Sequence, residues 1–153
     1  MSLDDLYREV ILDHYRKPRR RGSLEHADAH AEGQNPLCGD EISLDLALDG
    51  DRVTDVRILG RGCSISQASA SMMAEAVAGK TRAEIAELTH RFKVMMEIEE
   101  GDAGLDDERP GAALGDLEAL RGVRRFPVRI KCADLPWATL AEALGASPPP
   151  ADG

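Results

Sequence analysis

Residues 41–58 constrain the fold more than any other segment of this 153-residue chain. Apolar and polar side chains alternate over 42–48, and a shorter apolar series at 53–58 follows the dipeptide Asp49-Gly50. Alternation with a period of two is typical of a strand with one buried face, and Asp-Gly favours a tight hairpin turn. The segment therefore predicts an antiparallel hairpin, one face of which must be covered by other elements.

Helices are predicted on both sides of this hairpin. Apolar residues recur every three or four positions over 3–15, where Ser2 and Asp5 resemble a capping pair, and Thr81 with Glu84 gives a capping-box signature. The predicted helices cover 3–15, a stretch from Ser64 to Gly79, a stretch from Thr81 to about 96, 114–121, and about 135–144 with Asp134 as the cap. Residues 23–36 and the acidic stretch 97–108 are predicted to be loops. This order indicates an α+β fold, an antiparallel sheet covered by helices on one face.

Length and charge limit the classes of function. A chain of this size predicts a single domain, here 1–145, followed by a disordered tail at 146–153. The formal charge of −9 argues against bulk nucleic-acid binding, which needs a basic face. No apolar run approaches the roughly 20 residues of a membrane span, and no signal peptide is evident, so a cytoplasmic protein without a membrane partner is expected.

Three cysteines carry the clearest chemical signal: Cys38, Cys63 and Cys132. An odd number in a reducing compartment points to metal binding, catalysis or inert burial. Each cysteine is predicted to stand at the end of an element, and Asp40 lies two residues beyond Cys38. Three thiolates and one carboxylate form a four-ligand set that suits Zn²⁺. The spacing is not that of a zinc finger, so the residues alone leave open both a metal site and scattered, unrelated thiols.

Four segments resemble the NifU-N-terminal/IscU/SufU family of iron–sulfur cluster assembly proteins. They are LYREVILDHYRKPRRRG at 6–22, NPLCGD at 35–40, GRGCSISQASASMM at 60–73 and FPVRIKC at 126–132. The resemblance implies a SufE/NifU-like α+β fold with about three antiparallel strands. IscU-type scaffolds carry His immediately before the third cysteine and Lys three before it, where this chain has Lys131 and Arg129. Together with the long stretch at about 97–122, this difference favours the SufU branch.

The resemblance to SufU implies an enzyme, a zinc-dependent sulfurtransferase that accepts persulfide sulfur from a SufS-type, PLP-dependent cysteine desulfurase and serves the downstream cluster assembly machinery. It implies Cys38, Asp40, Cys63 and Cys132 as the zinc ligands and Cys38 as the catalytic sulfur acceptor. The four ligands and Zn²⁺ sum to −2, so Arg129 and Lys131 are expected to support the site. Two alternatives stay open: an IscU-like scaffold that assembles a [2Fe–2S] cluster on the same cysteines, and a zinc-stabilised interaction module.

The remaining charged features have simpler interpretations. His14 is predicted to be structural, and His26, His30 and His90 to be exposed. The basic residues at 16–21 favour a solvated patch or a docking surface for an acidic partner. A second basic group, Arg124 and Arg125 together with Arg129 and Lys131, lies close to Cys132 in the sequence and is expected to steer a partner towards the cysteines.

Overall fold

The hairpin predicted over 41–58 forms the centre of a three-stranded antiparallel sheet. In the computed structural model, which describes residues 2–36, 39–106, 108–109 and 111–146, β2 (Asp40–Asp49) pairs with β3 (Arg52–Arg61) and with β1 (Ala29–Asn35). The strand order is β1-β2-β3. The register places Asn35 opposite Asp40 and Glu41 opposite Arg61. The end of β1, the start of β2 and the end of β3 therefore meet at one end of the sheet.

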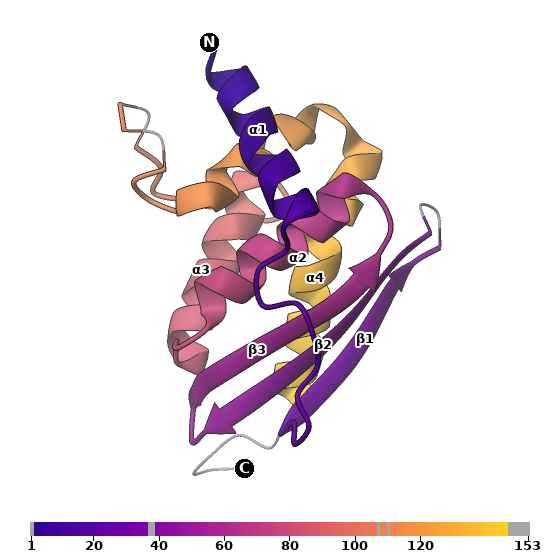
Figure 1. The fold of residues 1–153 in the computed structure, drawn as a ribbon. Coiled ribbons are helices and arrows are strands. Elements are labelled where there is room, and N and C mark those ends of the chain that lie inside the picture. The colour runs from indigo at the N-terminus through magenta and orange to yellow at the C-terminus, as the bar shows by residue number, and fades with distance from the viewer. Residues whose placement is uncertain (1, 37–38, 107, 110, 147–153) are drawn as a thin grey trace.

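The helices lie on one side of this sheet, and two of them pack directly on it (Figure 1). Their bounds are α1 (Leu3–Arg16), α2 (Ser64–Val77), α3 (Arg82–Met95), the 3₁₀ helix η1 (Gly115–Arg125) and α4 (Pro127–Ala146). α4 packs on β1 and β2, and α2 packs on β3. The α+β class with about three strands is therefore confirmed, as are the two predicted capping boxes at Ser2 and Thr81. Within the described residues, no helix is long and apolar enough to cross a membrane.

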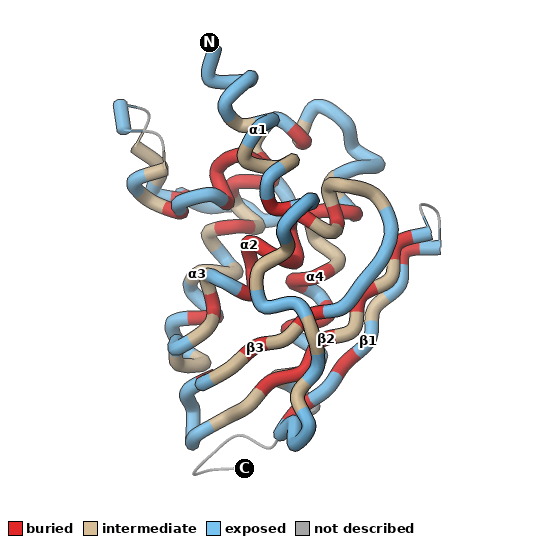
Figure 2. The backbone as a smooth tube through the Cα atoms, in the orientation of Figure 1, coloured by how far each residue is buried: buried red, intermediate tan, exposed pale blue. Residues whose placement is uncertain are grey.

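The core fills the space between the sheet, α2 and α4, where buried positions gather (Figure 2). The predicted inward face of β2 supplies Ile42, Leu44 and Leu46, all buried. Trp137 of α4 stacks on Phe92 of α3, with ring centroids 4.6 Å apart. Burial of these side chains holds α4 against the sheet and thereby fixes the position of α4 relative to the end of the sheet at Asp40.

The other face of the sheet is crossed by the segment that joins α1 to β1 (Figure 1). The Gly22 N–H donates to the Ile58 carbonyl at 2.9 Å, and the Leu24 N–H donates to Asp45 Oδ2 at 2.9 Å. Asp45 also binds His30 Nδ1 at 2.6 Å. The Asp45 carboxylate thus ties the crossing segment and β1 to the central strand.

The prediction of a loop over 23–36 is wrong for its second half, because Ala29–Asn35 forms β1. The segment is AHAEGQN, whose inward positions hold Ala29, Ala31, Gly33 and Asn35, none of them a large apolar residue. Such a strand lacks the branched and aromatic residues that mark strands in sequence. Its outward positions are polar because this face of the edge strand meets solvent.

The prediction that the last helix begins near Asp134 is also wrong, since α4 begins at Pro127. Cys132 therefore lies within a helix and not before one. Pro136 suggested a first turn, but it lies inside α4, where it cannot donate a hydrogen bond to the Cys132 carbonyl. The true first turn has its own proline, Pro127, at the position where a helix tolerates one best. The short helix predicted at 114–121 is the 3₁₀ helix η1.

Candidate metal centre

Three of the four predicted ligands converge at the end of the sheet where β2 begins. Asp40 is the first residue of β2, Cys63 is the N-cap of α2, and Cys132 lies in α4. One donor atom from each residue lies within 4.8 Å of the others. These residues are far apart in sequence, so the fold, and not a local motif, brings them together. Cys38, the fourth predicted ligand, lies outside the described residues.

Asp40 and Cys63 are in direct contact. Oδ1 of Asp40 accepts a hydrogen bond from the backbone N–H of Cys63 at 2.7 Å, which directs the carboxylate towards the start of α2. Oδ2 of Asp40 lies 3.7 Å from Cys63 Sγ. The corresponding edge of a tetrahedral zinc site with ordinary Zn–S and Zn–O lengths is about 3.6 Å. These two donors are therefore already spaced for one ion.

Gly62 makes room for this carboxylate. Its φ of +138° is a conformation that side-chain-bearing residues rarely adopt. A Cβ at this position would collide with Oδ1 of Asp40 and would lie 2.7 Å from Asp40 Cα. The close approach of β2 to the turn after β3 thus depends on glycine at 62.

The two described sulfur atoms have different surroundings. Cys63 Sγ is partly exposed and accepts from the Ser66 N–H at 3.4 Å, at the positive end of the α2 dipole. Cys132 is fully buried, and its Sγ lies 3.9 Å from Asn35 Nδ2 and 3.8 Å from the Val128 carbonyl oxygen. Asn35 was not predicted as a site residue, although it opens the NPLCGD segment.

Arg129 lies close enough to the sulfurs to interact with them electrostatically. Cys63, and to a smaller extent Cys132, raise the pKa of the Arg129 guanidinium above its ordinary value because a negative thiolate stabilises the cation. Lys131, two residues further along α4, is exposed. Arg124 and Arg125 are engaged elsewhere: Arg124 pairs with Glu97 at 3.5 Å, and Arg125 with Asp4 at 3.8 Å.

The donor set fits a soft or borderline divalent ion. Asp40 is 1% exposed and Cys132 is not exposed at all. A buried carboxylate is costly unless a cation or several hydrogen bonds compensate its charge. The one short hydrogen bond found for the Asp40 carboxylate among the described residues comes from the Cys63 amide. Sulfur and carboxylate donors are the ligands that Zn²⁺ accepts in tetrahedral sites.

A groove of about 950 Å³ opens beside Cys63. Residues of α1, of η1 and of the segment 126–129 form its walls. Phe126 and Val128 are 61% and 60% exposed at this groove, far more than large apolar side chains usually are. Its charged lining residues are Asp4, Arg8, Arg125 and Arg129. The groove is therefore locally cationic on a chain with a charge of −9.

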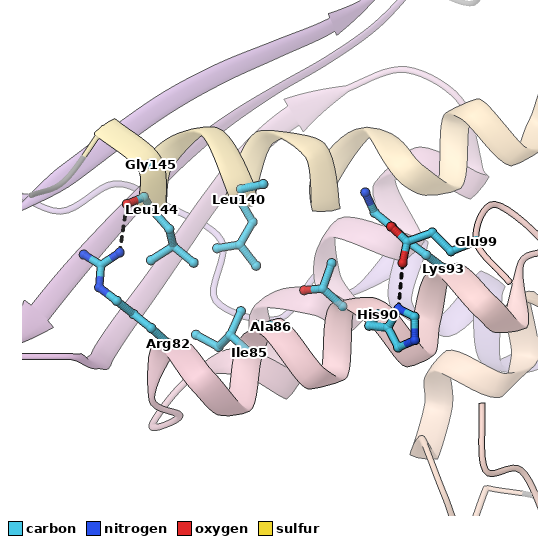
Figure 3. Close-up of a pocket in the computed structure, with 11 residues that line it drawn as sticks. Arg82, Ile85, Ala86, His90, Lys93, Glu99, Leu140, Leu144 and Gly145 are labelled. Carbon is cyan, nitrogen blue, oxygen red and sulfur yellow. Dashed lines mark hydrogen bonds and ion pairs between the residues drawn. The ribbon is translucent and has the colours of Figure 1, made fainter. Parts of the chain in front are cut away.

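A smaller groove of about 430 Å³ lies between α3 and α4 (Figure 3). Ile85, Leu140 and Leu144 form its apolar part, and His90 at its far end binds Glu99 at 2.7 Å. Arg82 uses one guanidinium nitrogen to bind the Leu144 carbonyl. None of the three converging metal-type donors lines this groove.

The histidines agree with their predicted structural or exposed character. His14 is fully buried and hydrogen-bonded through both ring nitrogens. His26, His30 and His90 are exposed, with His30 on β1 and His90 on α3.

Comparison with known proteins places this arrangement in a family. The NifU-like N terminal domain matches residues 6–133, a range that contains Asp40, Cys63 and Cys132. The chain belongs to the NifU-like N-terminal domain family. Within that family it is 46% identical over 143 residues to "Zinc-dependent sulfurtransferase SufU" of Bacillus subtilis, a match that covers 94% of this chain and 92% of that protein.

Other members of the NifU-like family carry a different name. The chain is 41% identical over 143 residues to "Iron-sulfur cluster assembly scaffold protein IscU" of Streptococcus pyogenes serotype M1, with 94% of this chain and 85% of that protein covered. Among solved structures, the N-terminal part of a nitrogen-fixing NifU-like protein from Brucella abortus matches with a TM-score of 0.78 at 26% identity, with 94% of each chain covered. The predicted resemblance and the SufE/NifU-like fold are therefore confirmed.

Proposed function

We propose that this chain is a zinc-dependent sulfurtransferase of iron–sulfur cluster assembly that takes persulfide sulfur from a SufS-type cysteine desulfurase. The observation that carries the proposal is the convergence of Asp40, Cys63 and Cys132 at one end of the sheet. Cys38 would complete the set as the fourth ligand. The Bacillus subtilis relative, named a zinc-dependent sulfurtransferase, supports the assignment of zinc and of sulfur transfer.

The transfer itself is a thiol–persulfide exchange. A thiolate of this chain attacks the outer sulfur of the desulfurase persulfide, a new S–S bond forms, and the desulfurase cysteine leaves as a thiolate. No external oxidant or reductant is needed, since one persulfide replaces another. Bound zinc would keep the cysteines of the site deprotonated at neutral pH and has no redox chemistry of its own.

We assign the acceptor role to Cys38. Cys132 is fully buried in α4, and Cys63 holds the first turn of α2 through the Ser66 N–H. Both cysteines therefore have structural roles, which would be disturbed if their side chains moved away to carry a persulfide. Cys38 precedes Asp40, the first residue of β2, by two positions in the sequence, and it is followed by glycine.

Asp40 makes the release of a ligand easier. A carboxylate is a harder, less well matched ligand for zinc than a thiolate, so a site with one carboxylate is less firmly closed than a Cys₄ site. A donor from the partner could replace it and leave a thiolate free to react. The Cys63 amide keeps the displaced carboxylate nearby, because its 2.7 Å hydrogen bond to Oδ1 does not depend on a metal.

The groove beside Cys63 is the docking surface that we propose for the desulfurase. It adjoins a ligand of the centre, it exposes Phe126 and Val128, and its arginines can attract acidic groups of a partner. Exposed apolar side chains surrounded by arginines are typical of protein interfaces. The partner would thus meet the site from the side on which Arg129 lies.

A second candidate function is an IscU-like scaffold that assembles a [2Fe–2S] cluster, since a Streptococcus pyogenes relative at 41% identity carries the scaffold name. Elemental analysis and desulfurase stimulation on one anaerobically purified sample separate the two. The sulfurtransferase predicts a colourless protein with zinc in its thiol centre that accelerates alanine formation by the desulfurase. Brown protein with stoichiometric iron and sulfide would instead establish the scaffold.

A further inference from the structure

A second group of metal-type donors lies between α1, α2 and η1. One donor atom each from His14, Glu75 and Asp116 lies within 4.8 Å of the others. The group contains no thiol and shares no residue with the centre at Asp40, Cys63 and Cys132. It therefore combines one imidazole and two carboxylates, ligands that zinc accepts in open, three-residue sites.

The imidazole of His14 is held in one orientation. The ring is fully buried, and Nδ1 lies 2.7 Å from Ser71 Oγ. Ser71 Oγ also accepts the Arg19 backbone N–H at 2.8 Å, and a hydroxyl oxygen has a second lone pair for a proton on Nδ1. Histidine ligands of metals are characteristically fixed through the other ring nitrogen in this way. The remaining nitrogen, Nε2, faces Asp116 Oδ2 at 2.8 Å.

The two carboxylates are accessible to ions from solvent. The side chains of Asp116 and Glu75 are 52% and 55% exposed, so each can turn towards an ion without repacking the core. Arg19 is the neighbouring cation, but its Nη2 binds Asp13 at 2.5 Å, while its Nε lies 4.0 Å from Glu75. The hydrogen bond from Arg19 lowers the pKa of the Asp13 carboxyl, so Arg19 interacts mainly with Asp13 and not with Glu75. Glu75 is thus only loosely paired.

The charge and spacing of the group suit a divalent ion. A neutral imidazole and two carboxylates sum to −2, which one Zn²⁺ neutralises. The tetrahedral edge between a zinc-bound nitrogen and oxygen is about 3.4 Å, so the Nε2–Oδ2 pair must open by roughly half an ångström. In return the ion replaces the proton that joins the two atoms.

We propose that His14, Glu75 and Asp116 form a second zinc site, with nitrogen and oxygen donors and a position left for water. An ion here joins three elements: α1, α2 and η1. Tyr7 and Ile11 of α1 and Val123 of η1 also line the groove beside Cys63. Zinc at this second site therefore stiffens two walls of that groove. The proposal does not depend on the sulfurtransferase activity.

Zinc stoichiometry in the intact protein tests the proposal. Wild-type protein that retains zinc at its thiol centre is dialysed against zinc buffered in the micromolar range, and bound zinc per chain is measured by elemental analysis. We expect a second equivalent in the wild type. Glu75→Gln and Asp116→Asn should each lose the second equivalent and keep the first, with binding at the second site weakened at least about tenfold. Both replaced side chains are exposed, so the variants should fold.

A matched control and a stability measurement complete the test. Glu87→Gln removes an exposed helical glutamate of α3 that is not part of the group, and it should bind both equivalents. Added zinc should raise the melting temperature of the wild type and of Glu87→Gln, but not of Asp116→Asn. A wild type that binds no second equivalent would overturn the proposal, as would a second equivalent that survives in both Glu75→Gln and Asp116→Asn.

Discussion

The Asp40 carboxylate accepts the backbone N–H of Cys63 at 2.7 Å and thereby joins the first residue of β2 to the N-cap of α2. The Asp40 side chain thus positions a neighbouring candidate metal ligand, Cys63, and is itself a candidate metal ligand. Because the link runs through a backbone amide, it holds the carboxylate against the site even when no ligand bond does. The lability that we assign to Asp40 is therefore compatible with a site that keeps its shape.

Replacement of Asp40 should change metal release and sulfur transfer together. Asp40→Ala removes one ligand and the acceptor for the Cys63 amide, so zinc should pass to a chromophoric chelator faster and desulfurase stimulation should fall. Asp40→Cys should release zinc more slowly than the wild type, because a fourth thiolate closes the site, and should also transfer sulfur poorly. Asp49→Ala, at the exposed far end of β2, is the matched control. Unchanged zinc release in both Asp40 variants would remove Asp40 from the ligand set.

Gly62→Ala should damage the centre without touching a ligand. The new Cβ collides with the Asp40 carboxylate, and alanine is strained at φ +138°, at a cost of order 1–3 kcal/mol. The expected result is a lower melting temperature together with a lower zinc content. Gly50→Ala is the control, since Gly50 also has a positive φ, +63°, but a Cβ added there would meet no atom within 4 Å. Equal zinc content in the two variants would contradict the close packing of Gly62 on Asp40.

Phe126 and Val128 should contribute to desulfurase docking more than to folding. Phe126→Ser and Val128→Ser remove large apolar side chains that are about 60% exposed, so the melting temperature should change little. The concentration of this protein that half-saturates desulfurase stimulation should rise, with the maximal rate less affected. Ile98→Ser, at another exposed apolar residue that does not line the groove, should leave it unchanged. If all three variants behave alike, this groove is not the docking surface.

His30 should make stability depend on pH. The hydrogen bond to Asp45, followed by that to Glu32, raises the pKa of His30 above its ordinary value of 6.5. The folded state thus binds the proton more tightly than the unfolded state. The resulting stabilisation is complete below the unfolded pKa and is lost as pH rises through the folded one. Urea midpoints of the wild type and His30→Gln should therefore differ more at about pH 5.5 than at about pH 8.5. A difference that is independent of pH would refute this origin.

Candidate ligands could be proposed from the sequence more readily than some of the elements that carry them. Asp40, Cys63 and Cys132 could be proposed as ligands because their residue types, and the segments around them, restrict the chemistry. Their convergence could not be derived from spacing, since it depends on the packing of α4 and α2 against the sheet. Asn35, which contacts Cys132 at 3.9 Å, carries no chemical signal of its own.

The errors in secondary structure have a common physical origin, tertiary contacts that outweigh local preference. β1 is polar and small, and it forms because β2 offers a free edge and Asp45 holds His30. α4 continues through Pro136 because Trp137 and Leu140, which follow the proline, are buried, and Trp137 stacks on Phe92. By contrast, β2 and the capped helices α1 and α3 follow directly from alternation and capping residues, which act locally.

The assignment of the sulfur acceptor is tested most directly by one rate measurement. Alanine formation from cysteine by a SufS-type desulfurase is measured with wild-type protein and with Cys38→Ser, whose folding is checked by its melting curve and circular dichroism. The account predicts stimulation by the wild type and none by folded Cys38→Ser, because the variant has no acceptor thiolate at that position. A folded Cys38→Ser protein that stimulates the desulfurase as well as the wild type would contradict it.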